Sequence, residues 1–165
     1  MTLILRVSLN IHAAVLLKLR SRQKESLNID KLAKLRMSVG KMSTALRILV
    51  IENHEATGTF ISLFLQRSGH QVTVVPDAKT ALDLNDLTRF DVILSDIGLP
   101  DLDGWELMKQ LRPHTGAYAI AMSGFGGDVD VKRSLAAGYQ HHLTKPFVPA
   151  ALEEVLRNVE PKHHG

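Results

Sequence analysis

The chain has no cysteine among its 165 residues and no long apolar run. Without cysteine, disulfide bonds and thiolate chemistry are excluded, and nothing indicates an oxidising compartment, so a cytoplasmic location is expected. The longest uninterrupted apolar run near the N-terminus covers residues 13–17, which is far short of the roughly 20 residues that span a membrane. We therefore expect no membrane span, and the same region lacks the pattern of a secretory signal.

Charge is unevenly distributed along the chain. Residues 1–47 carry ten Lys or Arg against two acids, a net charge of +8, and residues 48–165 have a net charge of −5. An acidic folded part suits a site that concentrates carboxylates around a cation. We predict a basic N-terminal extension at residues 1–44, partly helical around 26–37 or disordered, a folded domain at 45–160 and a tail at 161–165. Because the extension has no Phe, Tyr or Trp and no recognition-helix pattern, nucleic-acid binding is not expected.

From residue 45 onward, short apolar runs alternate with amphipathic stretches five times. The runs predict strands at residues 47–51, 71–75, 91–95, 117–122 and 141–144, and the stretches predict helices at 55–68, 78–87, 104–111, 128–137 and 149–159. Gly69, Pro113 and Gly138 fall where helices should stop. Strands joined by helical crossovers of this length predict an α/β fold, with a parallel sheet covered by helices on both faces.

The stretch FDVILSDIGLPDLDG, residues 90–104, indicates a site. Its apolar run is typical of a strand buried on both faces, and Asp96 follows that run. Ligands bind at the carboxyl ends of the strands in an open α/β sheet. Since turn residues follow Asp96, we expect its carboxylate to stand exposed at a strand tip. The first predicted strand leads to Glu52 and Asn53, the fourth leads to Ser123, and the fifth leads to Lys145.

These side chains together predict phosphoryl transfer to Asp96. A carboxylate at a strand tip can act as a nucleophile toward phosphorus. Oxygens of Glu52, Asn53 and Asp96 suit Mg²⁺, and the backbone carbonyl of Gly98 could complete the metal shell. The ion would neutralise charge on the nucleophile and on the phosphoryl group. The hydroxyl and the ammonium from the last two strands would hold the remaining phosphoryl oxygens.

Four segments, in this order, resemble the receiver domain of two-component response regulators: ILVIENHEAT (48–57), ILSDIGLPDLDGWEL (93–107), AMSGFGG (121–127) and AAGYQHHLTKPF (136–147). The resemblance implies a flavodoxin-like (βα)5 three-layer sandwich with strand order 2-1-3-4-5. It also implies a Mg²⁺-dependent phosphoacceptor that takes a phosphoryl group from a histidine kinase or a histidine phosphotransfer protein. Such a domain signals to a downstream protein by conformational switching and does not turn over an external substrate.

The resemblance further implies roles for individual residues. Asp96 is the implied phosphoacceptor. The implied metal ligands are Glu52, Asn53, Asp96 and the backbone carbonyl of Gly98. Lys145 and Ser123 would contact the phosphoryl group, and Ser123 and His142 would be the switch residues. The peptide bond before Pro146 is expected to be cis, which would point Lys145 into the site.

Two positions depart from the family pattern. Asn53 stands where the family usually has an acid that touches the metal, so we expect weaker Mg²⁺ binding and altered rates of phosphorylation or dephosphorylation. His142 stands where the family tends to have Tyr or Phe that rotates inward on activation, so the switch is expected to differ. The GYQHHLTKPF wording looks most like receivers attached to hybrid histidine kinases.

Two other classes of function remain as alternatives. A hydrolase of the haloacid dehalogenase type would carry a second Asp two residues after the nucleophile, where this chain has Gly98, and would carry the pair on its first strand. A phosphate-independent scaffold would keep the receiver surface after losing metal function through Asn53. We expect a single receiver domain without an output domain, since only residues 161–165 follow the last helix. Its oligomeric state is left open, a homodimer included.

Neighbouring residues have simpler interpretations. Asp101 and Asp103 are interpreted as turn and helix-cap residues, and His54 as a residue that caps or shields the acidic site. His141 and His142 are adjacent on a predicted strand. Their side chains should therefore point to opposite faces, and the two cannot chelate one metal together.

Overall fold

We describe the fold from a computed structural model, which describes residues 45–162. Residues 1–44 and 163–165, with the predicted helix at 26–37, lie outside that part. Along residues 45–162 the elements are β1 (Arg47–Ile51), α3 (Glu55–Arg67), β2 (Gln71–Val75), α4 (Ala78–Leu82), β3 (Val92–Asp96), α5 (Gly104–Leu111), a 3-10 helix η1 (Arg112–His114), β4 (Tyr118–Ser123), α6 (Asp128–Ala137), β5 (His141–Thr144) and α7 (Pro149–Leu156). Among these elements, no helix is long and apolar enough to cross a membrane.

The five strands form one sheet in the order β2-β1-β3-β4-β5. Every neighbouring pair is parallel, and Val50 of β1, for example, lies opposite Val74 on one side and Leu94 on the other. Because all strands run the same way, their carboxyl ends meet at one edge of the sheet. The predicted fold class and strand order are confirmed.

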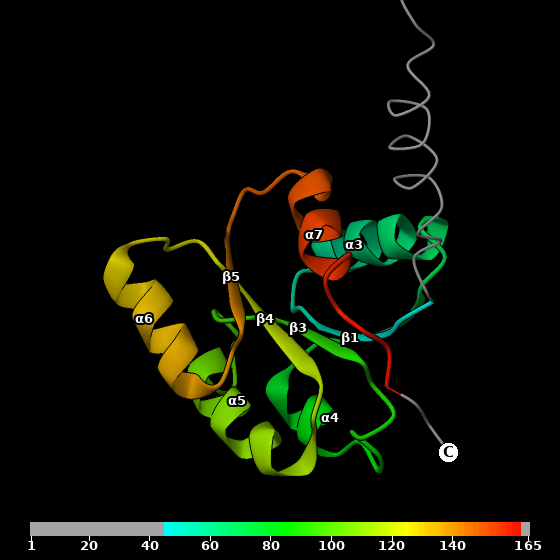
Figure 1. Cartoon of the computed structure of the whole chain (residues 1–165). Helices are drawn as coiled ribbons and strands as arrows, with labels where there is room; N and C mark the ends of the chain where they lie inside the picture. The colour runs from blue at the N-terminus through cyan, green and yellow to red at the C-terminus, as the bar shows by residue number, and fades with distance from the viewer. Residues whose placement is uncertain (1–44, 163–165) are drawn as a thin grey trace, which may run out of the picture. The chain divides into compact units, whose positions relative to one another are not determined.

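Residues of the central strands alternate between two buried clusters, because successive side chains on a strand point to opposite faces. Leu49 and Ile93 belong to the cluster on one face, and Val50 and Leu94 belong to the cluster on the other. Figure 1 shows α3 and α7 on one side of the sheet and α4, α5 and α6 on the other. The sheet is therefore the middle of three layers, which explains its continuous apolar runs.

Side chains and one glycine define several helix ends. Asp103 precedes α5, and its carboxylate accepts hydrogen bonds from two N–H groups in the first turn, as predicted for a cap. Asp101 caps a different helix, since its carboxylate accepts from the N–H groups of Ala78 and Lys79 at the start of α4. Gly138 ends α6 with a φ of 107°, in the left-handed region that glycine adopts readily.

Two helices are clearly shorter than predicted. α4 ends at Leu82 instead of residue 87 because Asp86 forms a local turn, in which its carboxylate accepts from the N–H and the hydroxyl of Thr88. α7 ends at Leu156 instead of residue 159. Beyond that point the N–H of Asn158 donates to the carbonyl of Val155, the tighter bonding pattern of a 3-10 turn.

Strands β3 and β4 begin and end one residue later than predicted. The reason is their register, in which Asp96 lies opposite Met122 and Ser123 lies opposite Thr144. Asp96 and Ser123 are therefore the last residues of their strands instead of the first residues of the following loops. Both side chains stand at the edge where the strands end.

Candidate functional site

Three charged side chains from different strands meet at the carboxyl edge of the sheet. Glu52 follows β1, Asp96 ends β3 and Lys145 follows β5. The ammonium Nζ of Lys145 lies 2.7 Å from Oε2 of Glu52 and 2.9 Å from Oδ2 of Asp96, and it donates a hydrogen bond to each. The Lys145–Pro146 peptide bond is cis, as expected. The structure thus brings together three residues that the sequence places after different strands.

Asp96 is not exposed at a strand tip, and that expectation was wrong. It is 6% exposed, and Glu52 is 2% exposed. Asp96 is held between its ion pair with Lys145 and the loop that follows β3, whose Gly98 N–H donates to Oδ1 of Asp96 at 3.1 Å. Turn residues after a strand describe only the local chain, whereas Asp96 also contacts a residue 49 positions further along the chain.

Lys145 is a permanent cation in this site. Partial burial lowers its pKa, but the hydrogen bonds to Glu52 and Asp96 and the charges of these carboxylates outweigh burial and hold the pKa above its usual 10.5. The ammonium offsets the repulsion between the two buried carboxylates. It also places a positive charge against Oδ2 of Asp96, where an anionic reactant would have to approach.

Backbone contacts fix the segment that follows Asp96. The N–H of Ile97 donates to the carbonyl of Met122 on β4, and the N–H of Gly104 donates to the carbonyl of Ile97, both at 2.9 Å. A Cβ on Gly104 would lie 2.5 Å from the carbonyl oxygen of Asp96 and 2.7 Å from Cα of Ile97. Only glycine fits there, and the close approach holds the start of α5 against the end of β3.

Asn53 offers an oxygen that has no partner. Its Oδ1 is a buried atom and makes no hydrogen bond to the described part of the chain. Buried polar atoms nearly always have a partner. A hard cation fits this position, because Mg²⁺ takes carboxylate and amide oxygens as ligands. The oxygens of Glu52, Asn53 and Asp96 therefore fit the predicted metal.

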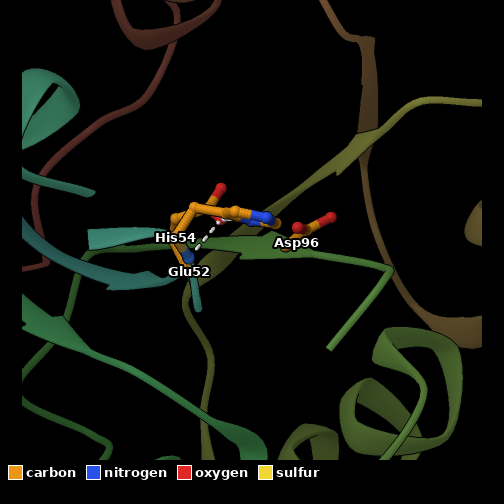
Figure 2. A group of neighbouring side chains, drawn as sticks. All are labelled: Glu52, His54 and Asp96. Atoms are coloured by element: carbon orange, nitrogen blue, oxygen red, sulfur yellow. Dashed lines mark hydrogen bonds and ion pairs between the residues drawn. The ribbon is translucent and has the colours of Figure 1, made fainter. Parts of the chain in front are cut away.

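His54 lies beside the same carboxylates, as predicted. Its Nδ1 is 3.2 Å from Oε1 of Glu52, and its backbone N–H donates to that oxygen at 3.0 Å. One possible ligand atom each from Glu52, His54 and Asp96 lies within 4.8 Å of the other two. Figure 2 shows the imidazole of His54 reaching toward Asp96. The acidic site therefore has a nitrogen donor at its rim.

Ser123 is buried at the end of β4. Its Oγ accepts a hydrogen bond from the N–H of Phe125 at 3.0 Å. Its carbonyl accepts the N–H of Lys145 at 2.7 Å. The predicted switch hydroxyl is thus tied to the loop at residues 124–127 through its side chain and to the lysine through its backbone.

His142 joins three segments through its ring. Nε2 lies 2.9 Å from the carbonyl oxygen of Phe125, and Nδ1 lies 2.8 Å from Oγ of Ser134 on α6. Ser134 Oγ in turn accepts from Nε1 of Trp105 on α5 at 2.9 Å. Because a carbonyl only accepts and an indole only donates, a neutral His142 carries its proton on Nε2 and Ser134 donates to Nδ1. His141 lines a groove with α7 instead, so the two histidines face opposite sides as predicted.

A groove of about 320 Å³ opens beside the acidic site. Glu52 and Asn53 line it together with Gly58 and Leu63 of α3 and Val74 of β2. Leu63 and Val74 are 53% and 41% exposed. The acidic site therefore adjoins a partly apolar surface at the β2 edge of the sheet.

The comparison with protein families decides the identity of this site. A family model described as response regulator receiver domain matches residues 48–157, which contain the whole site from Glu52 to Lys145. The chain belongs to the response regulator receiver domain family. The sequence resemblance is confirmed at the level of the family.

Two curated relatives share the receiver domain. The alkaline phosphatase synthesis transcriptional regulatory protein PhoP of Bacillus subtilis is 34% identical over 119 residues, which cover 69% of this chain and 50% of PhoP. The transcriptional regulatory protein CseB of Streptomyces coelicolor is 32% identical over 118 residues, which cover 72% of this chain and 50% of CseB. The chain spans about half the length of these curated relatives, so the likeness concerns the receiver domain alone.

A receiver domain of known structure is also similar. The receiver domain of the sensor histidine kinase PA1611 from Pseudomonas aeruginosa PAO1 is 30% identical, with a TM-score of 0.62 over 70% of this chain and 98% of that one. That structure is described as having a magnesium ion coordinated in its active-site cleft. The receiver fold is therefore supported by sequence and by structure.

The sequence did not predict the contact of Ser134 with the predicted switch residue His142. Ser134 is fully buried and joins His142 to Trp105. Its only sequence signal is a polar residue on the face of α6 that also carries Ala137. The ligand role of the Gly98 carbonyl stays a prediction.

Proposed function

We propose that this receiver domain accepts a phosphoryl group onto Asp96 from the phosphohistidine of a histidine kinase or a histidine phosphotransfer protein, in a Mg²⁺-dependent reaction. The observation that carries the proposal is the contact of Lys145 with both Glu52 and Asp96 at the ends of three parallel strands. A positioned cation is what a reaction between two anions needs, because charge is stabilised best by groups fixed in advance. Receiver domains are signalling modules, and no external substrate is turned over in this proposal.

Asp96 supplies the nucleophile in the proposed reaction. One carboxylate oxygen bonds to phosphorus while the P–N bond of the donor breaks. The electron pair of that bond stays on the donor imidazole, which leaves as a neutral ring because its other nitrogen carries a proton. The products are an acyl phosphate at Asp96 and an unphosphorylated donor histidine.

Lys145 and Ser123 hold phosphoryl oxygens in this proposal. The ammonium of Lys145 already lies 2.9 Å from Oδ2 of Asp96, so it can donate to a group bonded there. Ser123 accepts from Phe125 through Oγ. Because a hydroxyl both accepts and donates, its own proton remains for a phosphoryl oxygen while the contact with Phe125 persists.

Glu52, Asn53, Asp96 and the Gly98 carbonyl would hold the metal ion. When bound, Mg²⁺ supplies positive charge that reduces the repulsion between the nucleophile and the phosphoryl group. The unpaired Oδ1 of Asn53 supports this assignment. Since an amide adds no charge, we expect this site to bind Mg²⁺ more weakly than a site with an acid at the same position.

Phe125 connects both predicted switch residues. Its N–H donates to Ser123, and its carbonyl accepts from His142. A phosphoryl group that draws Ser123 toward Asp96 would therefore act on His142 through one residue. The affinity of a downstream protein changes if it binds one arrangement of residues 124–127 and the adjoining α6–β5–α7 face better than the other. The exposed apolar side chains of Phe125, Val129 and Val148 support this face as the output surface.

The phosphodonor must reach Asp96 from the open side of the site. The groove beside Glu52, with Leu63 and Val74 exposed in it, supports a protein donor that buries apolar area there. The likeness to hybrid-kinase receivers stays a prediction, because the curated relatives are named transcriptional regulatory proteins and the solved receiver comes from a sensor histidine kinase. The absence of nucleic-acid binding and a cytoplasmic location also stay predictions.

A phosphate-independent scaffold is the second candidate function. The observation that favours it is Asn53, which gives the metal site one negative charge fewer than an acid at the same position would. The scaffold would use the same surfaces without phosphorylation. Lys145 and both acids are retained with close contacts, which is why we prefer the phosphoacceptor.

Intact mass after incubation with acetyl phosphate tests the proposal. With Mg²⁺ we expect the wild-type chain to gain the mass of one phosphoryl group, and without Mg²⁺ or after Asp96→Asn we expect no gain. Asp83→Asn makes the same chemical change at an exposed carboxylate and should leave the adduct in place. No adduct in any wild-type sample would overturn the proposal, and absence of metal binding as well would favour the scaffold.

A further inference from the structure

The side chain of His54 is exposed beside the metal site and does not cap its own helix. It is 72% exposed, whereas the Glu52 carboxylate that it contacts is fully buried. His54 is the N-cap residue of α3 through its backbone, but its side chain makes no cap hydrogen bond. The imidazole therefore has no structural task at the start of this helix.

The two carboxylates each have one oxygen that does not contact Lys145. Oε2 of Glu52 and Oδ2 of Asp96 receive the lysine, whereas Oε1 of Glu52 contacts the ring of His54 and Oδ1 of Asp96 accepts from Gly98. An ion held by Glu52 and Asp96 would lie close to the imidazole, since one possible ligand atom from each of the three residues lies within 4.8 Å of the other two (Figure 2).

The mixed set of donors changes which ion the site should prefer. Mg²⁺ is a hard cation that takes oxygen ligands, so an imidazole gives it little. First-row divalent transition-metal ions accept imidazole nitrogen more readily than Mg²⁺ does, and their affinity rises from Mn²⁺ to Cu²⁺. Asn53 also lowers the negative charge of the site, which weakens the purely electrostatic attraction on which Mg²⁺ depends.

We propose that His54 is a ligand in the metal site of this receiver domain and shifts its preference from Mg²⁺ toward first-row divalent transition-metal ions such as Mn²⁺. The inference rests on the proposed metal site at Asn53 and Asp96. It adds a nitrogen ligand and a selectivity that a site made of oxygens alone lacks.

Metal titrations of the full chain measure the selectivity. Calorimetric dissociation constants for Mn²⁺ and Mg²⁺ are compared between the wild-type chain, His54→Ala and His114→Ala, an exposed histidine on η1. Loss of the imidazole should raise the Mn²⁺ dissociation constant at least about tenfold, a loss typical of groups that support a metal. The Mg²⁺ constant should change by less than about twofold, because Mg²⁺ gains little from nitrogen. His114→Ala should change neither constant.

Pulsed electron paramagnetic resonance of bound Mn²⁺ tests the bond directly. Nitrogen-14 modulation from a coordinated imidazole should be present in the wild-type chain and in His114→Ala, and absent in His54→Ala. Modulation that persists in His54→Ala, or is absent from the wild-type chain with Mn²⁺ bound, would overturn the inference. Equal losses of Mn²⁺ and Mg²⁺ affinity would also overturn it, since they would indicate a role in shape or charge only.

The phosphorylation experiment separates this inference from the proposed function. An Asp96 phosphoryl adduct formed with Mg²⁺, combined with Mn²⁺ that shows no nitrogen coupling, contradicts the role of His54 and leaves the phosphoacceptor standing. Nitrogen coupling from His54 without any adduct at Asp96 contradicts the phosphoacceptor and supports the metal inference.

Discussion

Oγ of Ser134 lies 2.8 Å from Nδ1 of His142 and joins α6 to β5. The same oxygen accepts from the indole of Trp105, and the other ring nitrogen of His142 contacts the carbonyl of Phe125. The hydrogen bonds therefore run from the start of α5, which follows the Asp96 loop, to residues 124–127. A receiver with Phe or Tyr at position 142 could not continue this chain of bonds through Nδ1.

Removal of the Ser134 hydroxyl should destabilise the domain. Ser134→Ala leaves the buried Trp105 N–H without an acceptor and Nδ1 of His142 without a donor, so we expect the free energy of unfolding to fall by about 1–3 kcal/mol. Urea unfolding followed by circular dichroism measures the change. A cycle with Trp105→Phe measures the coupling, and a double variant that loses the sum of the single losses would show that the two side chains act independently.

Residues 124–127 should become more mobile when His142 no longer holds Phe125. His142→Phe removes the donor to the Phe125 carbonyl, so we expect faster amide hydrogen exchange in this loop. His141→Phe is the matched control, because that ring points to the opposite face of β5 and lines a groove with α7. Equal exchange in both variants would show that His142 does not restrain the loop.

An acid at position 53 should strengthen Mg²⁺ binding. Asn53→Asp adds a negative charge to an oxygen that is already buried at the site, and we expect the Mg²⁺ dissociation constant to fall at least about tenfold because affinity rises with ligand charge. Asn85→Asp makes the same change at an exposed residue before β3 and should have no effect. Calorimetry measures both. An unchanged constant in Asn53→Asp would remove Asn53 from the set of ligands.

Acid should destabilise the fold through His70. Burial lowers the pKa of His70 below 6.5, an effect that the charge of Glu153 only partly opposes, and Nδ1 accepts the N–H of Leu46 at 3.2 Å. With a lowered folded-state pKa, the stabilising contribution is complete above about pH 6.5 and is lost as the pH falls through the folded pKa.

Chemical-shift titration and urea unfolding check this pH dependence. The His70 ring should titrate below pH 6.5, and the free energy of unfolding should fall between about pH 8 and about pH 5. His70→Gln should show a smaller fall than the wild-type chain, whereas His114→Gln should follow the wild-type chain. A His70 midpoint above 6.5 would contradict the prediction.

The strands and their active edge were predictable because their signals are local. The apolar run at residues 92–94 is buried on both faces, and the polar residues that follow the strands have to meet when every strand runs the same way. Helix lengths were less predictable. Leu87 is buried, and its position in the sequence fits a continuation of α4. The backbone instead reaches Leu87 at the turn that Asp86 forms with Thr88. The spacing of apolar residues alone cannot distinguish a longer helix from this turn.

The parts of the site that the sequence did not predict depend on distant contacts. Asp96 is buried and pairs with Lys145, whereas a loop position alone suggested exposure. The path from Trp105 through Ser134 to His142 needs three elements in place, so a lone serine in a helix gave no sign of it. His54 comes two residues after Glu52, and its place beside the acidic site was predicted, but its contact with the carboxylate depends on how the chain turns after β1.

In the order of synthesis on the ribosome, the lysine of the site comes after both of its acids. Glu52 is synthesised 93 residues before the lysine that neutralises it, and Asp96 49 residues before. A nascent chain that stops short of β5 holds both acids without the lysine that offsets their repulsion. Because Lys145 follows β5, the contacts of the two acids with lysine form only after the last strand of the sheet has been made.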